Sequence, residues 1–493
     1  MKLLPRSISL TVTVLILFSG LHWFGANISA SNQQAAIPAA QDAHTYFAEV
    51  RRDTARLRAF LRHLPKGGEL HTHLSGLPTP ERLLELAVQS KRYRYYVLIP
   101  GQPTSVTDRA AYAFIPFPLD QTPPTDRDGA FITPAALLQA ETEEQRNRLN
   151  AFRRAHTINP DETKPLDIFY EATFQRRSAL TSNPEIMSLL VADAVRQAHL
   201  DHISYLELQL SPFPFEPLAK LAEREQAINL TSAREHLSHL IDAAQRVNAQ
   251  LPAQERVEVR FLLSFSRTNM KLFTFLPLAF ELAAGSDTIA AAIAGINIVG
   301  DEYSQDPQVG QQIAAPAYLQ DYLLTLHRVY PTVRLTLHAG EHTKWDWHVR
   351  DSILMGAERI GHATNLSASP NSAERDLLRR HRILVEACLT SNKLLLGVPL
   401  ARHPYLSYLR AGVPVSLNTD DAGIFRTTLT EEFARAVENH PDLTWQELRQ
   451  LARNSLEYAF VPETTKEILL TRWQQEMGEF EAAKDWQQWL ARR

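Results

Sequence analysis

Apolar and polar residues follow two alternating patterns along most of this chain. Short apolar runs with the character of strands are separated by longer stretches, such as 232–250 and 316–330, in which apolar residues have the spacing of an amphipathic helix. We identify eight such runs, at residues 67–74, 203–210, 257–265, 295–299, 333–339, 358–362, 383–388 and 413–418. Strands that alternate with helices favour parallel βα units, and eight units favour a closed (β/α)8 TIM barrel of the α/β class. An open, doubly wound sheet is the alternative, and the fourth and sixth runs are the weakest.

Three segments lie outside this alternation. Apolar positions within 44–64 have helical spacing and predict one N-terminal helix before a barrel domain at 65–460. The gap between the first two strands is far longer than one helix needs, so we expect an insertion after the first strand, at about residues 91–165. Its aromatic residues favour an ordered lid over a loop. Residues 461–493 predict a helical C-terminal extension.

The first thirty residues predict export. Lys2 and Arg6 precede an apolar run, and the small residues Ser29 and Ala30 offer a cleavage point, as in a signal peptide at 1–30. The small, polar residues that follow, at 31–43, predict a linker. An uncleaved membrane anchor is the alternative, although the run is short and diluted by serine and threonine. We therefore expect a periplasmic or secreted protein without stable membrane association after cleavage.

Composition narrows the classes of function. The 493 residues carry a net charge of -4, so the chain has no basic field that would favour nucleic acid. Its single cysteine, Cys388, can form no internal disulfide and excludes a zinc site built on paired cysteines. Composition leaves the oligomeric state open, a homodimer included.

Titratable residues gather at the carboxyl ends of four of the predicted strands. These residues are His71 and His73 in "GGELHTHL", His338 and Glu341 in "LHAGE", His362 in "RIGHAT", and Asp420 and Asp421 in "SLNTDD". Active sites of TIM barrels lie at this end of the strands. Each motif alone is compatible with a half-buried strand, a turn or a helix cap. Together, at one rim of one barrel, they favour a functional site.

Three imidazoles and one carboxylate suit a divalent, zinc-like ion. The donors would be His71, His73, His338 and Asp420. An ion held there would bring the pKa of a bound water close to neutrality. Glu341 lies three residues beyond a ligand and could deliver a proton, while Asp421 would point toward a substrate. The residues alone therefore predict a mononuclear metal hydrolase.

Six motifs of the chain resemble those of the adenosine deaminase family, within the metal-dependent hydrolase superfamily. They are "LPKGGELHTHLSG", "GDE", "LHAGE", "RIGHAT", "EACLTSN" and "SLNTDDAGIF", in the same order and spacing, between about residues 64 and 460. The "PKG" lead-in and the exported N-terminus are similar to the secreted, growth-factor-related branch of the family. The resemblance implies zinc-dependent hydrolytic deamination of adenosine, and of 2′-deoxyadenosine, to inosine and ammonia, with one Zn²⁺ per chain.

The resemblance also implies a role for each catalytic residue. Glu341 would protonate N1 of the purine while a water activated by the metal attacks C6. His362 would orient that water and stabilise the developing charge, and Asp420 would help to take its proton.

Four further residues are implied to bind the substrate, a small-molecule purine nucleoside. Asp421 would hold N7, the backbone N–H of Gly300 would meet N3, and His73 would contact the substrate beside the metal. Ser75 stands where the family usually has an aspartate that contacts the ribose 5′-hydroxyl. Serine cannot form that charge-assisted bond, and it repels a 5′-phosphate less. Two alternatives therefore stay open: a deaminase of another 6-aminopurine, such as a nucleotide or a modified adenine, and an extracellular purine-binding signalling protein without turnover.

Overall fold

The computed structural model of the protein describes residues 43–99, 110–120, 131–162, 165–213, 230–269, 271–303, 316–344, 346–368 and 373–483. The predicted signal peptide and the linker up to residue 42 lie outside this range, as do parts of the insertion and the end of the C-terminal extension, so these assignments stay predictions. Among the described residues, no helix has the length and apolar character that crossing a membrane requires.

Eight parallel strands form the central sheet, in the order β1-β5-β6-β7-β8-β9-β10-β11. Their bounds are β1 (Gly67–His73), β5 (Ile203–Leu210), β6 (Glu258–Ser266), β7 (Ile293–Val299), β8 (Leu335–Ala339), β9 (Arg359–His362), β10 (Leu384–Ala387) and β11 (Val415–Leu417). A parallel bridge between Thr72 and Asp420 joins the end of the last strand to the first. The predicted (β/α)8 barrel is confirmed, and both of the weakest runs are strands.

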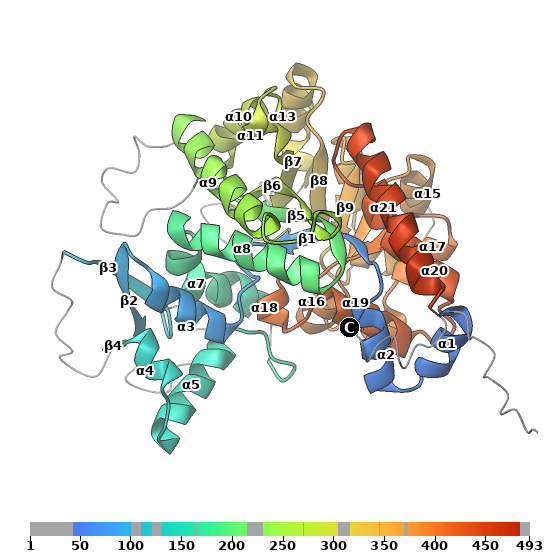
Figure 1. Cartoon of the computed structure of the whole chain (residues 1–493). Helices are drawn as coiled ribbons and strands as arrows, with labels where there is room; N and C mark the ends of the chain where they lie inside the picture. Colours follow the sequence, from blue (N-terminus) through green and yellow to red (C-terminus); the bar gives the residue numbers. More distant parts are fainter. Residues whose placement is uncertain are drawn as a thin grey trace, which may run out of the picture. The chain divides into compact units, whose positions relative to one another are not determined.

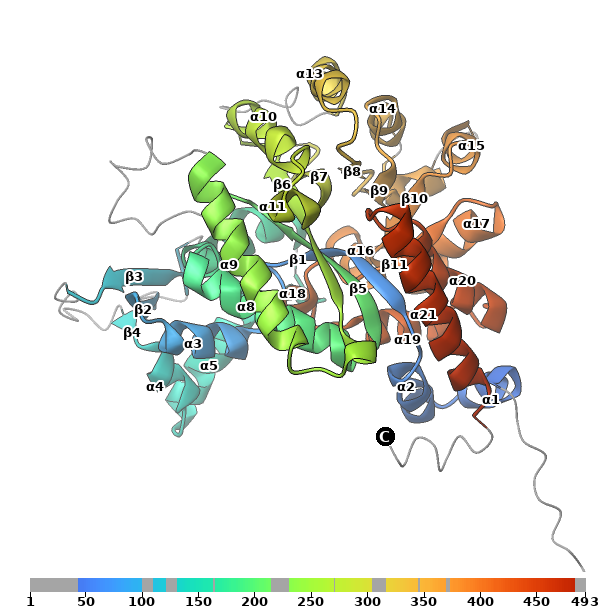
Figure 2. The same ribbon diagram turned by 45° about the horizontal axis from the view of Figure 1, so that its top comes forward.

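Helices pack around the outside of the strands (Figure 2). They include α8 (Pro184–Leu200), α9 (Leu230–Asn248), α10 (Leu272–Ala283), α11 (Thr288–Ala291), α13 (Pro316–Val329), α14 (His348–Leu354), α15 (Ala373–Arg380), α17 (Tyr405–Arg410), α19 (Leu429–Asn439) and α20 (Trp445–Glu457). Two shorter helices, α16 (Leu389–Leu396) and α18 (Ala422–Phe425), follow β10 and β11 and contact each other. Helix α8 shows why these segments are helical. The Asn183 side chain accepts the backbone N–H of Glu185, Pro184 stands in the first turn, and one apolar face is buried.

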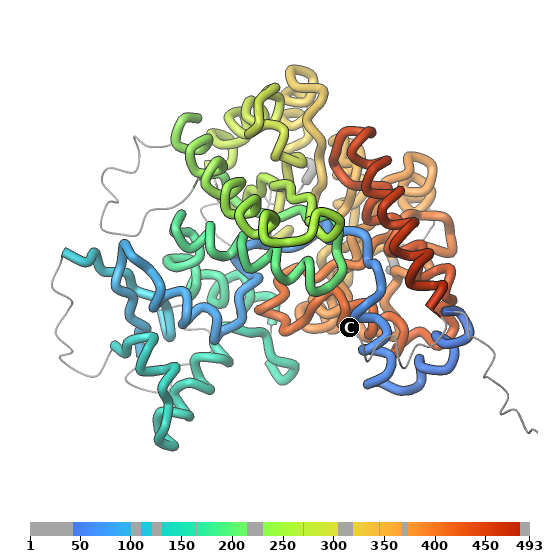
Figure 3. Tube along the Cα trace, in the orientation of Figure 1, coloured from blue at the N-terminus to red at the C-terminus, as the bar shows by residue number. Residues whose placement is uncertain are grey.

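The N-terminal segment forms two helices, α1 (Ala43–Val50) and α2 (Thr54–Arg62), so the prediction of one helix over 44–64 is wrong. The cause is Asp53, whose extended backbone breaks the first helix and whose carboxylate accepts the N–H groups of Ala55 and Arg56. Both helices pack against the C-terminal helices, including α21 (Glu463–Glu481) (Figure 3). The ring of Phe60 lies 5.0 Å from that of Phe480.

The described part of the predicted insertion is ordered and begins after α3 (Pro80–Gln89), the helix that follows β1. It holds an antiparallel sheet of β2 (Tyr93–Leu98), β3 (Phe114–Pro118) and β4 (Phe131–Ile132), with α4 (Pro134–Leu138) and α5 (Glu143–Ala155) (Figure 1). The chain then returns to α8 through α6 (Pro165–Ile168), the π-helix η1 (Phe169–Thr173) and α7 (Phe174–Thr181). Phe114 packs edge-on against Phe152, which gives this sheet an aromatic core of its own.

A network of buried charges crosses the inside of the barrel. The guanidinium of Arg359, on β9, donates to Glu207 of β5 at 3.0 Å, and its Nε lies 2.7 Å from Glu386 of β10. All three side chains are 0% exposed. Tyr205 adds a hydrogen bond to Glu207 at 2.6 Å. Because isolated charges are costly to bury, these groups depend on one another.

We expect Arg359→Leu to lower the free energy of unfolding by about 3–5 kcal/mol, because it leaves Glu207 and Glu386 buried without their cation. Chemical denaturation measures the change. Arg148→Leu is the control, since Arg148 is 43% exposed and pairs with Glu144 on the surface of α5, where an ion pair contributes roughly 0–1 kcal/mol. Equal losses in the two variants would contradict the structural role of the network.

Candidate active site

The carboxyl ends of β1, β8 and β11 bring the four predicted metal ligands together. One ligand atom from each of His71, His73, His338 and Asp420 lies within 4.8 Å of the others. Oδ1 of Asp420 is 3.5 Å from Nε2 of His71 and 3.4 Å from Nε2 of His73. Nε2 of His73 is 3.3 Å from Nε2 of His338. Four donors separated by up to 349 positions in the chain thus face one point.

Hydrogen bonds on the far side of these ligands orient them. His71 donates from Nδ1 to Glu386 at 2.7 Å, and His338 donates from Nδ1 to Asn297 at 3.2 Å. The hydroxyl of Ser391 donates to Oδ2 of Asp420 at 2.6 Å. Partners of this kind fix the tautomer and direction of metal ligands.

The ligand atoms of the four residues have the chemistry of a metal site. Nε2 of His71 is buried, and within the described residues it has no hydrogen-bond partner. Burying a ring nitrogen without a hydrogen-bond partner costs free energy. An ion at the point where the four donors meet would give Nε2 of His71 a partner. Three imidazole nitrogens and a carboxylate oxygen fit a zinc-like cation. The cluster could therefore hold a divalent metal ion.

Burial and pairing shift the pKa values of two neighbouring histidines in opposite directions. Burial lowers the pKa of His73 to about 4, so this imidazole is a neutral donor near pH 7. Burial also acts to lower the pKa of His71, but the adjacent carboxylates of Asp420 and Glu386 outweigh that effect and raise it to about 10. Burial opposes ionisation of Asp420, yet His71 and the other imidazoles hold its pKa below the usual range.

Glu341 follows β8 and points into the same end of the barrel. Its Oε2 accepts the phenol of Tyr170 at 2.7 Å, and its Oε1 lies 3.8 Å from Nε2 of His362. Burial, followed by the nearby charge of Asp420, raises the pKa of Glu341 to about 8. A carboxyl group with this pKa carries a proton near neutral pH, as a general acid requires.

His362 ends β9 and is held in one tautomer. Asn392 donates to its Nδ1 at 3.0 Å, and Asn392 in turn accepts from His403 at 2.9 Å. The ring proton of His362 is therefore on Nε2, the nitrogen on the Glu341 side, which makes no hydrogen bond within the described chain. Burial lowers the pKa of His362 to about 4, which keeps the ring neutral.

The backbones of His362 and Asp420 are in the left-handed conformation, which is uncommon for residues other than glycine. The φ angle is 67° at His362 and 62° at Asp420. Such conformations cost on the order of 1–3 kcal/mol and gather at functional sites, where the surrounding structure enforces them. Here the main chain of Asp420 is held on both sides, by the carbonyl of His71 at 2.9 Å and by the N–H of His73 at 3.0 Å.

The predicted substrate residues lie at the same barrel end. Both carboxylate oxygens of Asp421 are buried and make no hydrogen bond to the described residues. Burial and the adjacent Asp420 raise the pKa of Asp421 well above its usual value, so this carboxyl can donate a hydrogen bond. Gly76 leaves it room, since a Cβ at Gly76 would overlap Oδ1 of Asp421. Ser75 is half-buried in the turn after β1, and Gly300 follows β7 with a φ of 93°.

Several residues around the site could not be identified from their motifs. Tyr170 comes from η1, and short π-helices are frequent at functional sites, yet its segment reads as an ordinary helix. Asn297 and Glu386 are polar residues inside strands, a weak signal that they face the barrel interior rather than the apolar side. Gln209 orients Asn297 by accepting its amide at 2.9 Å.

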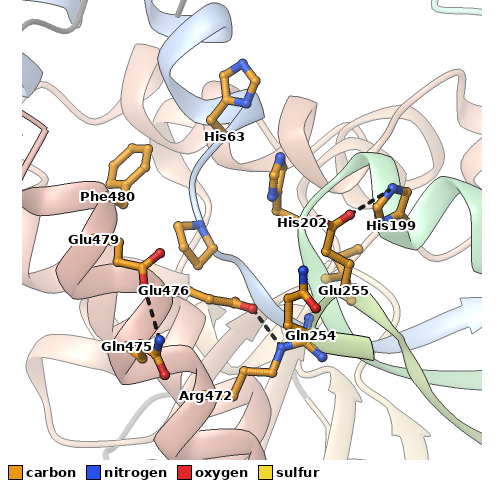
Figure 4. Close-up of a pocket in the computed structure, with 12 residues that line it drawn as sticks. His63, His199, His202, Gln254, Glu255, Arg472, Gln475, Glu476, Glu479 and Phe480 are labelled. Atoms are coloured by element: carbon orange, nitrogen blue, oxygen red, sulfur yellow. Dashed lines mark hydrogen bonds and ion pairs between the residues drawn. The ribbon is translucent and has the colours of Figure 1, made fainter. Parts of the chain in front are cut away.

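A different cavity, of about 350 Å³, lies at the opposite end of the barrel, near the start of β1 and β5 (Figure 4). Its charged groups largely pair with one another. His199 lies 3.7 Å from Glu255, and Arg472 lies 2.7 Å from Glu476. The cavity shares none of its lining residues with the candidate metal cluster.

Comparison with known proteins agrees with this geometry. The family model described as adenosine deaminase matches residues 150–475. A human N6-methyl-AMP deaminase is 28% identical over 304 residues, which are 61% of this chain and 78% of that protein. A Lactococcus lactis adenosine deaminase is 26% identical over 330 residues, or 64% and 81% of the two chains. The crystal structure of a Burkholderia ambifaria amidohydrolase with bound Zn superposes with a TM-score of 0.56 at 18% identity, covering 88% of this chain and 95% of that one, and shares the fold.

We expect Gly361→Ala to weaken Zn²⁺ binding about 10–100-fold, the range found when the support of a metal ligand is disturbed. A Cβ at Gly361 would lie 2.8 Å from Cε1 of His71 and would push that ring out of line. Equilibrium dialysis against Zn²⁺ gives the affinity. The control is Gly478→Ala, on the surface of α21, where a Cβ meets no atom within 4 Å. Unchanged affinity in Gly361→Ala would show that His71 is not a ligand.

Proposed function

Because the chain belongs to the adenosine deaminase family, we propose that it hydrolyses the 6-amino group of adenosine, and of 2′-deoxyadenosine, to give inosine and ammonia. The observation that carries the proposal is the placement of Glu341. This buried acid, which can hold a proton near neutral pH, stands 3.8 Å from His362 at the barrel end where the four metal donors converge. An acid beside a metal site, rather than in it, is what protonation of a purine ring nitrogen requires.

We propose Zn²⁺ as the metal, held by His71, His73, His338 and Asp420. The donor set supports zinc, because imidazole nitrogens and a single carboxylate are ligands that this ion commonly takes. When bound, zinc would supply a water of lowered pKa as the nucleophile.

The proton steps follow from the hydrogen bonds of the site. Tyr170 holds Oε2 of Glu341, which leaves Oε1 to donate to N1 of the purine. A proton on N1 draws electrons from C6 and makes that carbon electrophilic. His362, with its proton on Nε2, would stabilise the oxygen that adds to C6, and Asp420 would accept the proton of the attacking water. Asp421 would donate to N7, and the N–H of Gly300 to N3.

A residue assigned to the 5′ end of the substrate supports a second candidate function. Ser75 offers no negative charge to exclude a phosphate, and relatives at similar identity include both an adenosine deaminase and an N6-methyl-AMP deaminase. The alternative function is therefore deamination of a 6-aminopurine nucleotide or a modified adenine at the same site.

An ultraviolet assay tests the proposal. Purified protein with adenosine should lose adenine absorbance as hypoxanthine forms, a chelator should stop the reaction, and added Zn²⁺ should restore it.

Glu341→Gln should lower kcat by about 10²–10⁴-fold while the metal content is unchanged, because the amide cannot transfer a proton to N1. Glu463→Gln, whose side chain is 74% exposed, is the matched control. Tight adenosine binding without ammonia release would instead favour a binding protein, and full activity of Glu341→Gln would refute the assigned role.

We expect Ser75→Asp to raise the ratio of kcat/KM for adenosine to that for AMP or N6-methyl-AMP by roughly tenfold or more. A carboxylate at this position repels a 5′-phosphate and can accept the 5′-hydroxyl of a nucleoside. Ser75→Asn is the control, since it has nearly the same size as aspartate without its charge. If the two variants shift the ratio equally, residue 75 does not face the 5′ end of the substrate.

A further inference from the structure

A second group of metal-ligating side chains lies beside the loop that carries Glu341. Glu302 follows β7, His342 follows Glu341, and His348 begins α14. One ligand atom from each of the three lies within 4.8 Å of the others, and the carboxylate of Asp346 adjoins them. We propose that Glu302, His342, Asp346 and His348 bind a second divalent ion of the zinc class.

The distances within this group suit one shared cation. Oδ2 of Asp346 is 3.1 Å from Nε2 of His342 and 3.2 Å from Nδ1 of His348. Oε2 of Glu302 is 3.9 Å from Nε2 of His342 and 2.5 Å from Nδ1 of His348. Ligand atoms around a tetrahedral zinc are about 3.3 Å apart, because each lies about 2.0–2.1 Å from the metal. Three of the four spacings need shifts of well under 1 Å, and only the shortest must open by nearly that much.

His342 points its ring at the group without forming a hydrogen bond. Both ring nitrogens are buried and have no hydrogen-bond partner in the described part of the chain, although Nε2 is close to the carboxylate of Asp346. Nε2 of His71 has the same relation to Asp420 in the candidate catalytic cluster. Such close but misaligned pairs are expected of ligands whose lone pairs converge on an ion between them.

The two carboxylates of the group are oriented by their own donors, as metal-binding carboxylates usually are. Glu302 accepts the backbone N–H groups of Gly340 at 3.0 Å and Glu341 at 2.8 Å. Asp346 accepts the amide of Asn365 at 2.9 Å, and the phenol of Tyr303 donates to its other oxygen. The side chains are 2% exposed for Glu302 and 11% for each histidine, so an ion would be largely enclosed.

An ion at this position would act on catalysis only through the main chain. It would hold Glu302, and Glu302 holds the N–H groups of Gly340 and Glu341. The four residues are positioning residues in this sense, and they share no ligand with the predicted catalytic metal. Metal binding by this group therefore does not depend on whether the protein deaminates adenosine.

Counting metal ions tests it. The whole protein is stripped with a chelator, dialysed to equilibrium against Zn²⁺, and its zinc is measured by elemental analysis. We expect two ions per chain in the wild type and one in the double variant His342→Ala/His348→Ala. His71→Ala/His73→Ala should also bind one, at the other site. His381→Ala, an exposed histidine elsewhere, should still bind two. A zinc count that is the same in the wild type and in the His342→Ala/His348→Ala protein would overturn the proposal.

A single, conservative variant tests the same site if the double variant does not fold. His342→Gln keeps a polar side chain at a position that is already 11% exposed, and it should weaken only one of two binding events, by about 10–100-fold. If both zinc affinities are unchanged in His342→Gln, the group is a hydrogen-bonded ion-pair network, and it binds no metal.

Discussion

Closure of the barrel between its last and first strands is the constraint on which the site depends. The backbone of Asp420 accepts the N–H of His73 at 3.0 Å and donates to the carbonyl of His71 at 2.9 Å. These two bonds fasten residues from opposite ends of the chain into one register, with both histidines and the carboxylate at the same rim. They also impose the left-handed backbone of Asp420. Without this closure, the donors of β1 would belong to a sheet edge and not to a metal cluster.

Burial then sorts the charged groups of the barrel into two kinds. Groups with an opposite charge in contact form buried ion pairs, as Arg359 does with Glu207 and Glu386. Groups without such a partner move toward neutrality, as Glu341 and Asp421 do. The paired charges of Glu207, Arg359 and Glu386 therefore form a support for the metal ligand His71. The unpaired carboxyl groups of Glu341 and Asp421 carry protons instead. The support lies on β5, β9 and β10, whereas the two acids follow the ends of β8 and β11.

Segments added to the barrel complete the site from outside. The chain that returns from the insertion places Tyr170 on Glu341, so an element far from the metal ligands orients the acid. On the other side, Glu302 holds the main chain of the same loop and belongs to the second histidine and carboxylate group. Glu341 is thus held by its side chain from one segment and by its backbone from another.

The eight strands, their order and the residues at their carboxyl ends could be predicted from the sequence, because strand periodicity and the position of a residue in a strand are local properties. His71 and His73 are an example, since their spacing alone puts both rings on one side of β1. The motifs also identified the adenosine deaminase family. Local pattern was insufficient where a cap competes with helical spacing, and Asp53 consequently divides a segment predicted as one helix. Only the tertiary structure decided the positions of Tyr170, Asn297 and Glu386, and the meeting of Glu302 with His342 and His348, because these contacts join segments whose distance in space depends on how the barrel closes and how its loops pack.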